Sequence, residues 1–130
     1  MSLCSAFARI NGEVCVDTGD IRVSEKRLYT GFVYSCSVVT CQYTDIHTNK
    51  TINLLGHIDE LTPDMYNKLY SALNDIPIKT ITNFNVYYGS LCKNNCSSKQ
   101  IIHNVFSNLG IDESKITVKI IKDNEVYVPE

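Results

Sequence analysis

The segment Tyr29–Val39, which reads YTGFVYSCSVV, combines aromatic and β-branched residues with one cysteine, Cys36. Residues of these types favour strands, and we predict that a strand begins at Cys36 and continues to Tyr43. A second apolar segment, residues 51–55, follows a polar loop and leads to His57. Two strand-like segments joined by a polar loop indicate a hairpin. The sequence therefore predicts that the strand of Cys36 lies beside the strand of His57.

Two segments further along the chain have apolar residues at helical spacing. In the first, over residues 62–76, Thr62 is the predicted N-cap and Pro77 ends the helix. Ser97 or Ser98 is the predicted N-cap of the second helix, and Gly110 is its predicted left-handed stop.

Strand-like patterns cover most of the remaining chain, over residues 13–16, 21–23, 28–33, 80–88, 116–121 and 125–128. Asp123 and Asn124 predict a hairpin turn between the last two strands. The order of strands, helix, strand, helix and strands favours an α+β fold, a layered sandwich of mixed β-sheet or sheets with two main helices. No repeat or linker divides the sequence, so we predict a single domain over residues 1–130.

The composition is that of an ordinary globular protein, since 44% of the 130 residues are hydrophobic and 20% are charged. A formal net charge of −2 and the scatter of the basic residues argue against nucleic acid as a partner. No apolar stretch approaches the roughly 20 residues that a membrane span needs. Residues 1–9 are too short and too polar for a signal peptide. We therefore expect neither nucleic acid nor a membrane as a partner.

The chain has six cysteines, an even number that is compatible with a disulfide framework. They are Cys4, Cys15, Cys36, Cys41, Cys92 and Cys96. The strong strand and helix patterns, however, differ from those of a small loop-rich domain held by disulfides. We therefore predict reduced thiols and a cytoplasmic location.

A thiol becomes a useful nucleophile as a thiolate, which requires a nearby imidazole or another positive group. His47 falls in a predicted polar loop, and His103 falls inside a predicted helix. His57, near the end of a strand, is the histidine best placed to be held beside Cys36. On this pattern alone, a cysteine in a valine-rich strand is more often a small core residue.

A family resemblance strengthens the case for Cys36. Thr30 lies six residues before this cysteine, Ser35 lies directly before it, and His57 lies at the end of the next predicted strand. With this spacing, and with the segment Asp17–Val23, most of the chain resembles the CheD-type chemoreceptor glutamine deamidases. The resemblance implies a CheD-like fold and a Cys–His core shared with toxin deamidases of the cytotoxic necrotizing factor type.

The resemblance implies a protein glutamine deamidase, which converts glutamine side chains of a partner protein to glutamate and releases ammonia. Cys36 would attack the carboxamide carbon, His57 would take the thiol proton, and the hydroxyl or carbonyl of Thr30 would orient the imidazole. Ser35 and Ser37 would flank an oxyanion site whose donors are backbone N–H groups near the cysteine. The reaction needs no cofactor and no metal. The target would lie in the cytosol of the same cell, or of a cell into which the chain is delivered.

The chain departs from the family pattern at the predicted substrate rim, formed by Tyr34, Gly56, Tyr88 and Gly89. The family has glycine at the position of Tyr34, and a double glycine where this chain has Gly89 and Ser90. Because glycine shapes the turn that presents the thiol, a tyrosine alters that turn. We expect these differences to change the substrate more than the chemistry.

Other interpretations stay open on the residues alone. Cys92, Cys96 and His103 have a C-x₃-C-x₆-H spacing that a small zinc-binding domain could use, although C-x₂-C and C-x₄-C knuckles are more usual. The same two cysteines could form a local disulfide or be ordinary loop thiols. The chain could be an inactive protein-binding module with tyrosines at its interface. An amine could also replace water in the second step, which would give transamidation.

Overall fold

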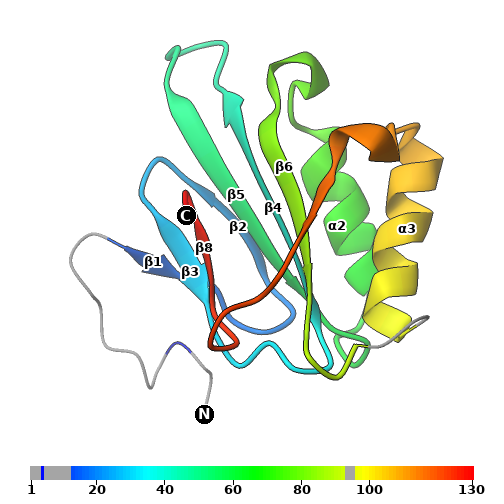
Figure 1. Cartoon of the computed structure of the whole chain (residues 1–130). Helices are drawn as coiled ribbons and strands as arrows, with labels where there is room; N and C mark the ends of the chain where they lie inside the picture. Colours follow the sequence, from blue (N-terminus) through cyan, green and yellow to red (C-terminus); the bar gives the residue numbers. More distant parts are fainter. Residues whose placement is uncertain (1–3, 5–12, 93–95) are drawn as a thin grey trace.

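The structure, a computed structural model, describes Cys4, residues 13–92 and residues 96–130. Within residues 13–92 and 96–130, two sheets and two α-helices form an α+β sandwich, which confirms the predicted fold class (Figure 1). In chain order the elements are β1 (Val14–Cys15), β2 (Ile21–Ser24), β3 (Leu28–Thr30), β4 (Ser37–Thr44), β5 (Thr51–Ile58), α2 (Met65–Asn74), β6 (Thr82–Tyr88), α3 (Ser97–Leu109), β7 (Thr117–Lys119) and β8 (Val126–Val128).

The larger sheet has five strands in the order β2-β5-β4-β6-β7, and the smaller sheet has three in the order β1-β3-β8. β4 and β5 form an antiparallel hairpin in which Val38 lies opposite His57. This register confirms that the segments of Cys36 and His57 are neighbours. β6 and β7 are parallel, so the larger sheet is mixed.

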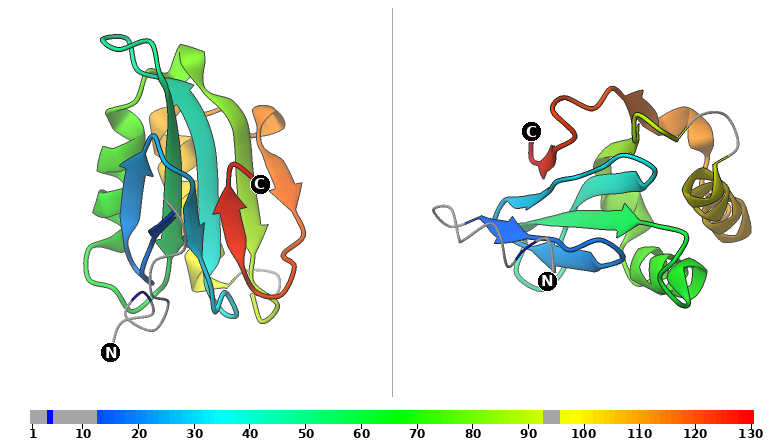
Figure 2. Two further views of the ribbon diagram at one scale, coloured as in Figure 1. Left: turned by 90° about the vertical axis from the view of Figure 1, so that its left-hand side faces the viewer. Right: turned by 90° about the horizontal axis from the view of Figure 1, so that it is seen from below.

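The larger sheet lies between the two helices and the smaller sheet (Figures 1 and 2). Side chains alternate between the two faces of a strand. On β4, Val38 therefore packs between the sheets and Val39 packs under the helices. Each face has its own apolar core, and burying these residues is the main stabilising contribution. The core between the sheets consists of Val16, Leu28, Val33, Val38, Leu55, Tyr87, Val126 and Val128.

The predicted start of the first helix is wrong by two residues, since the N-cap is Asp64 and not Thr62. α2 begins at Met65, and its N-cap, Asp64, has a left-handed φ of 63°. Thr62 does not cap the helix, because its backbone N–H donates to Asp59 Oδ1 at 3.0 Å and its side chain packs against Gly19. The N-cap of α3 is Cys96, so the predicted cap at Ser97 or Ser98 is wrong by at least one residue. α3 ends at Gly110 with a φ of 68°, as predicted.

The predicted C-terminal hairpin is wrong, although its turn is present. Asp123 and Asn124 both have a φ of 56°, and Lys122 bridges to Glu125. The strands on either side then separate: β7 joins β6 in the larger sheet, and β8 joins β3 in the smaller one. A turn sets the reversal of the chain, whereas burial of apolar residues sets the strand pairing.

The prediction of six reduced thiols is also wrong. Cys4 and Cys15 form one disulfide, and Cys92 and Cys96 form another. Their Cα atoms are 5.6 Å and 5.3 Å apart, in the usual range for disulfides. Cys36 and Cys41 are free. Sequence spacing could not reveal these pairs, because a pair depends on which loops the fold brings together.

Across the described ranges, neither helix has the length and apolar character of a membrane span. The expectation about a signal peptide rests on residues 1–9, nearly all of which lie outside the described residues.

Candidate active site

The fold brings Thr30, Cys36 and His57 to the space between the two sheets. Cys36 directly precedes β4 and packs against the core between the sheets, on the same face as Val38. His57 lies opposite Val38, so its side chain shares that face. Cys36 and His57 are thus diagonal neighbours, a relation that spans about 7–8 Å between Cα atoms. Thr30 approaches from β3 of the smaller sheet.

The hydrogen bonds of Thr30 determine the tautomer of His57. Thr30 Oγ1 lies 2.7 Å from the carbonyl oxygen of Val16 and 2.7 Å from His57 Nδ1. A carbonyl only accepts, so the single hydroxyl proton of Thr30 is donated to Val16. The bond to His57 therefore requires Nδ1–H as its donor, and Nε2 carries the lone pair.

His57 is fully buried, and burial lowers its pKa from 6.5 to about 4, although Asp59 and Asp17 act in the opposite direction. The imidazole is therefore neutral at pH 7. Its Nε2 is buried without a hydrogen-bond partner among the described residues. A buried neutral nitrogen with a free lone pair is suited to accept a proton.

The backbone of His57 is fixed by the turn before β2. Its N–H donates to the carbonyl of Asp20 at 3.0 Å, and its carbonyl accepts from the N–H of Gly19 at 2.8 Å. Gly19 has a φ of 79°, which favours glycine, and a Cβ there would lie 2.0 Å from Thr62 Oγ1. The segment Asp17–Val23 thus positions the histidine.

The Cys36 thiol is half-buried and protonated at rest. Burial is the main cause that raises its pKa above 9.0, and the carboxylates of Asp59 and Glu60 add to this, whereas a hydrogen bond from Ser35 lowers it. No hydrogen bond joins this thiol to His57 within the described part of the chain. The pair is thus a neutral thiol and a neutral imidazole, not a thiolate–imidazolium ion pair.

The loop that carries Cys36 is held by the turn after β6. The N–H of Gly89 donates to the carbonyl of Cys36 at 2.9 Å, and the N–H of Leu91 donates to the carbonyl of Tyr34 at 2.9 Å. A Cβ on Gly89 would lie 2.0 Å from the Tyr34 oxygen and 2.8 Å from the Cys36 oxygen. Gly89 is therefore a support beneath the loop, not the predicted rim residue.

Ser35 and Ser37 have different positions. Ser35 lies beside the thiol, and its carbonyl accepts from Ser98 Oγ at 3.3 Å. Ser37 faces the helices, where its hydroxyl is 2.8 Å from Ser98 Oγ and 3.5 Å from Cys92 Sγ. Ser37 is thus on the opposite face from Cys36, and its side chain supports the loop from below. Apart from its predicted role as a helix cap, no feature of the residue pattern pointed to Ser98.

Only one of the four predicted rim residues lies at the rim with an exposed side chain. Tyr34 is 42% exposed, and its neighbour Leu91, which the sequence did not single out, is 66% exposed. Gly56 is buried in the middle of β5, where a Cβ would contact Ile21. Tyr88 packs against the helix-side core and lies under Lys99 of α3, so it faces away from the thiol.

The three residues that could have formed a zinc site, Cys92, Cys96 and His103, have other partners. Cys92 and Cys96 are joined in a disulfide, and His103 Nδ1 lies 2.5 Å from Glu113 Oε1. Within the described residues, no group of three or more histidine, cysteine or acidic side chains is arranged to hold a metal ion.

No protein-family model matches the chain, and no curated protein matches it.

Proposed function

We propose that the chain is a cysteine-dependent amide hydrolase that deamidates glutamine side chains of a partner protein. The observation that carries the proposal is the Thr30–His57 hydrogen bond, which leaves the lone pair of Nε2 on the face that Cys36 shares. A thiol next to an oriented neutral base is the arrangement that acyl transfer through a thioester requires.

In the proposed mechanism, His57 Nε2 takes the thiol proton while Cys36 Sγ attacks the carboxamide carbon. The proton moves to the imidazole while the sulfur attacks, because the thiol pKa is raised and the imidazole pKa is lowered. A thiolate–imidazolium pair therefore does not form beforehand. The imidazolium then gives its proton to the departing ammonia. Water, deprotonated by the same nitrogen, hydrolyses the thioester to glutamate and restores the thiol.

The choice of glutamine follows from the CheD-type spacing of Thr30, Ser35, Cys36 and His57. The loop of Cys36 and the turn that supports it expose an aromatic side chain, Tyr34, and a leucine, Leu91, which suit a protein substrate better than a small molecule. The two disulfides favour passage through an oxidising compartment before action in a target cytosol.

The test is incubation of the protein with a soluble proteome in heavy-oxygen water, followed by mass spectrometry. The expected product is glutamate carrying one heavy oxygen at a position encoded as glutamine. Cys36→Ser and His57→Gln should both abolish it. Cys41→Ala is the matched control, because Cys41 is the other free thiol and faces the helix-side core. Product from Cys36→Ser at the wild-type rate would refute the proposal.

A second candidate, an inactive binding module, is favoured by the raised pKa of Cys36 and by the missing hydrogen bond to His57. Alkylation by iodoacetamide distinguishes the two, since Cys41 is buried and burial raises its pKa to about 12. If His57 is the base, His57→Gln should slow alkylation of Cys36 at neutral pH. An unchanged alkylation rate of Cys36, together with no heavy-oxygen glutamate, would show that the chain is an inactive binding module.

A further inference from the structure

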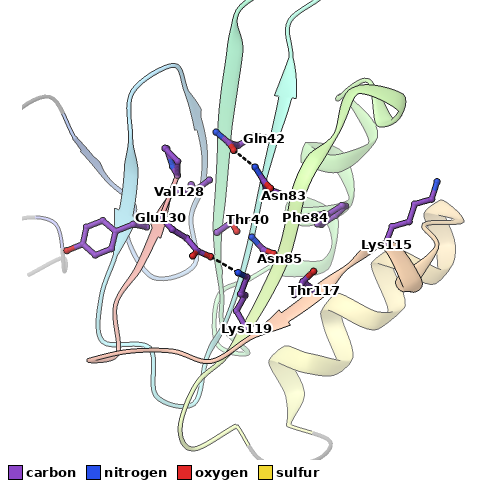
Figure 3. A pocket seen from close by; sticks show the side chains of 12 residues that line it. Thr40, Gln42, Asn83, Phe84, Asn85, Lys115, Thr117, Lys119, Val128 and Glu130 are labelled. Carbon is purple, nitrogen blue, oxygen red and sulfur yellow. Dashed lines mark hydrogen bonds and ion pairs between the residues drawn. The ribbon is translucent and has the colours of Figure 1, made fainter.

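A polar cavity of about 450 Å³ lies between the two sheets, at the edge where β8 ends (Figure 3). Its floor is the part of the larger sheet formed by β4, β6 and β7. Thr40, Asn85 and Thr117 form one row across these strands, because Thr40 pairs with Asn85 and Asn85 pairs with Thr117. The cavity shares no residue with the candidate active site.

Two polar side chains of this floor are more than nine-tenths buried. The exposed fraction is 1% for Thr40 and 8% for Asn85. The Thr40 hydroxyl lies near the Tyr87 phenol but forms no hydrogen bond of normal geometry with any described residue. A buried hydroxyl without a hydrogen bond costs stability, so its presence in the wall of this cavity needs an explanation.

The neighbouring amides are already fixed in position. Asn83 Nδ2 donates to Gln42 Oε1 at 2.8 Å (Figure 3). Gln42 Nε2 in turn donates to Asn53 Oδ1 at 2.9 Å. Amides and hydroxyls both donate and accept, which suits a ligand whose own hydroxyls do the same.

One end of the cavity holds a carboxylate, that of Glu130. Lys119 Nζ lies 3.3 Å from its Oε1 (Figure 3). The Tyr87 hydroxyl donates to the same oxygen at 2.7 Å. These two contacts lower the pKa of Glu130. The side chain of Glu130 is exposed, so a ligand carboxylate could exchange with it.

We propose that this cavity binds a small hydroxylated carboxylic acid, such as a sugar acid. The ligand hydroxyls bond to Thr40 and Asn85, and the ligand carboxylate takes the place of Glu130 on Lys119 and Tyr87. This inference does not depend on the proposed deamidase, because Cys36→Ser should leave the binding unchanged.

The test is an NMR titration of the full chain with D-glucuronate, D-galacturonate and D-gluconate. D-Glucose and acetate are the matched controls, since the first has only hydroxyls and the second has only a carboxylate. At least one acid should shift the side-chain amide signals of Asn85 and Asn83, with affinity about tenfold or more above both controls. The proposal is overturned if no acid shifts them, or if glucose or acetate binds as well as the acids.

The variant Thr40→Val gives opposite effects on binding and stability. It should weaken acid binding about tenfold, because one hydrogen bond to the ligand is lost. It should also raise the Tm of the free protein by about 3 °C, because an unpartnered buried hydroxyl is removed. Thr51→Val, at an exposed position of β5, is the control and should change neither quantity. A lower Tm for Thr40→Val with unchanged binding would assign Thr40 to structure alone.

Discussion

The proton of the Thr30 hydroxyl determines which nitrogen of His57 can act as a base. Had the hydroxyl donated to the imidazole, Nδ1 would hold the lone pair and Nε2 would carry the proton. The carbonyl of Val16 prevents this, because it can only accept. A backbone group outside the Cys–His pair thus fixes the reactive form of the histidine.

Thr30→Val should remove this control while preserving the shape of the side chain. We expect a mixture of His57 tautomers and a fall in the rate of the proposed reaction of about 10²–10⁴-fold. NMR of the ring nitrogens measures the tautomer without any substrate. Thr30→Ser, which keeps the hydroxyl, should retain the Nδ1–H form. An Nδ1–H form that persists in Thr30→Val would show that the threonine is not its cause.

The buried His57 also predicts an acid-sensitive stability. Its pKa is about 4 in the folded chain, and a histidine in an unfolded chain titrates near 6.5. Between these values the unfolded chain binds more protons, so the free energy of unfolding falls as the pH falls from about 6.5 towards 4. Above pH 6.5 this contribution is fully present. The whole difference corresponds to roughly 3 kcal/mol.

Urea unfolding between pH 7 and pH 4.5 measures this effect. The wild type should lose more stability on acidification than His57→Gln, whereas His47→Gln, at an exposed position, should follow the wild type. If the free energy of unfolding fell equally with pH in the wild type and in His57→Gln, that result would contradict the lowered pKa of His57.

At the level of elements, the cysteine loop depends on the turn after β6. Two backbone hydrogen bonds from Gly89 and Leu91 hold the carbonyls of Cys36 and Tyr34, and the contact is too close for any side chain at Gly89. The presentation of the thiol is therefore set by β6 as much as by the loop itself.

Gly89→Ala should displace this loop, because the new Cβ meets backbone and not a flexible side chain. We expect a loss of roughly 2–4 kcal/mol in the free energy of unfolding, and a changed alkylation rate of Cys36. Gly56→Ala is the control: its nearest contact is Ile21 Cγ1 at 3.2 Å, and a side chain can shift. Equal effects of the two variants on the alkylation rate would exclude a specific role for Gly89.

The sequence predicted the elements whose signals are local. The hairpin of β4 and β5 and the stop of α3 at Gly110 follow from alternation and from the freedom of glycine. The start of α2 was misplaced because Thr62 makes other contacts. Its N–H donates to Asp59 and its side chain packs against Gly19, and the residue pattern does not reveal either contact. Tyr88 was wrongly placed at the rim, because the face of the sheet on which a side chain lies depends on strand register. The residue pattern alone does not determine that register.

For the whole molecule, the sequence predicted the α+β sandwich but not the way its sheets divide. The Asp123–Asn124 turn suggested that the last two strands pair, yet they belong to different sheets. The pairing of Thr30 with His57 across the layers was expected only through the family resemblance. The carbonyl of Val16 was missed because every residue has a carbonyl, so the residue pattern carries no signal for it.

The disulfides make a prediction for the molecule as a whole. Peptide mapping without reductant, on protein prepared under oxidising conditions, should find Cys4 bonded to Cys15 and Cys92 bonded to Cys96. Reduction should lower the Tm, chiefly through the bond that closes the longer loop, Cys4–Cys15, since loop entropy grows with length. Any linkage that includes Cys36 would contradict the structure, and Cys41→Ala should leave the map unchanged.

The smaller sheet joins the first strand of the described fold to the last. Thr30 on β3 pairs directly with Val126 on β8, so the strand that orients His57 gains this neighbour only after a long stretch of further sequence has been made. During synthesis, the cysteine and histidine segments therefore leave the ribosome long before their geometry can form. In the enzyme we propose, catalytic competence would therefore begin only when β8 docks against β3.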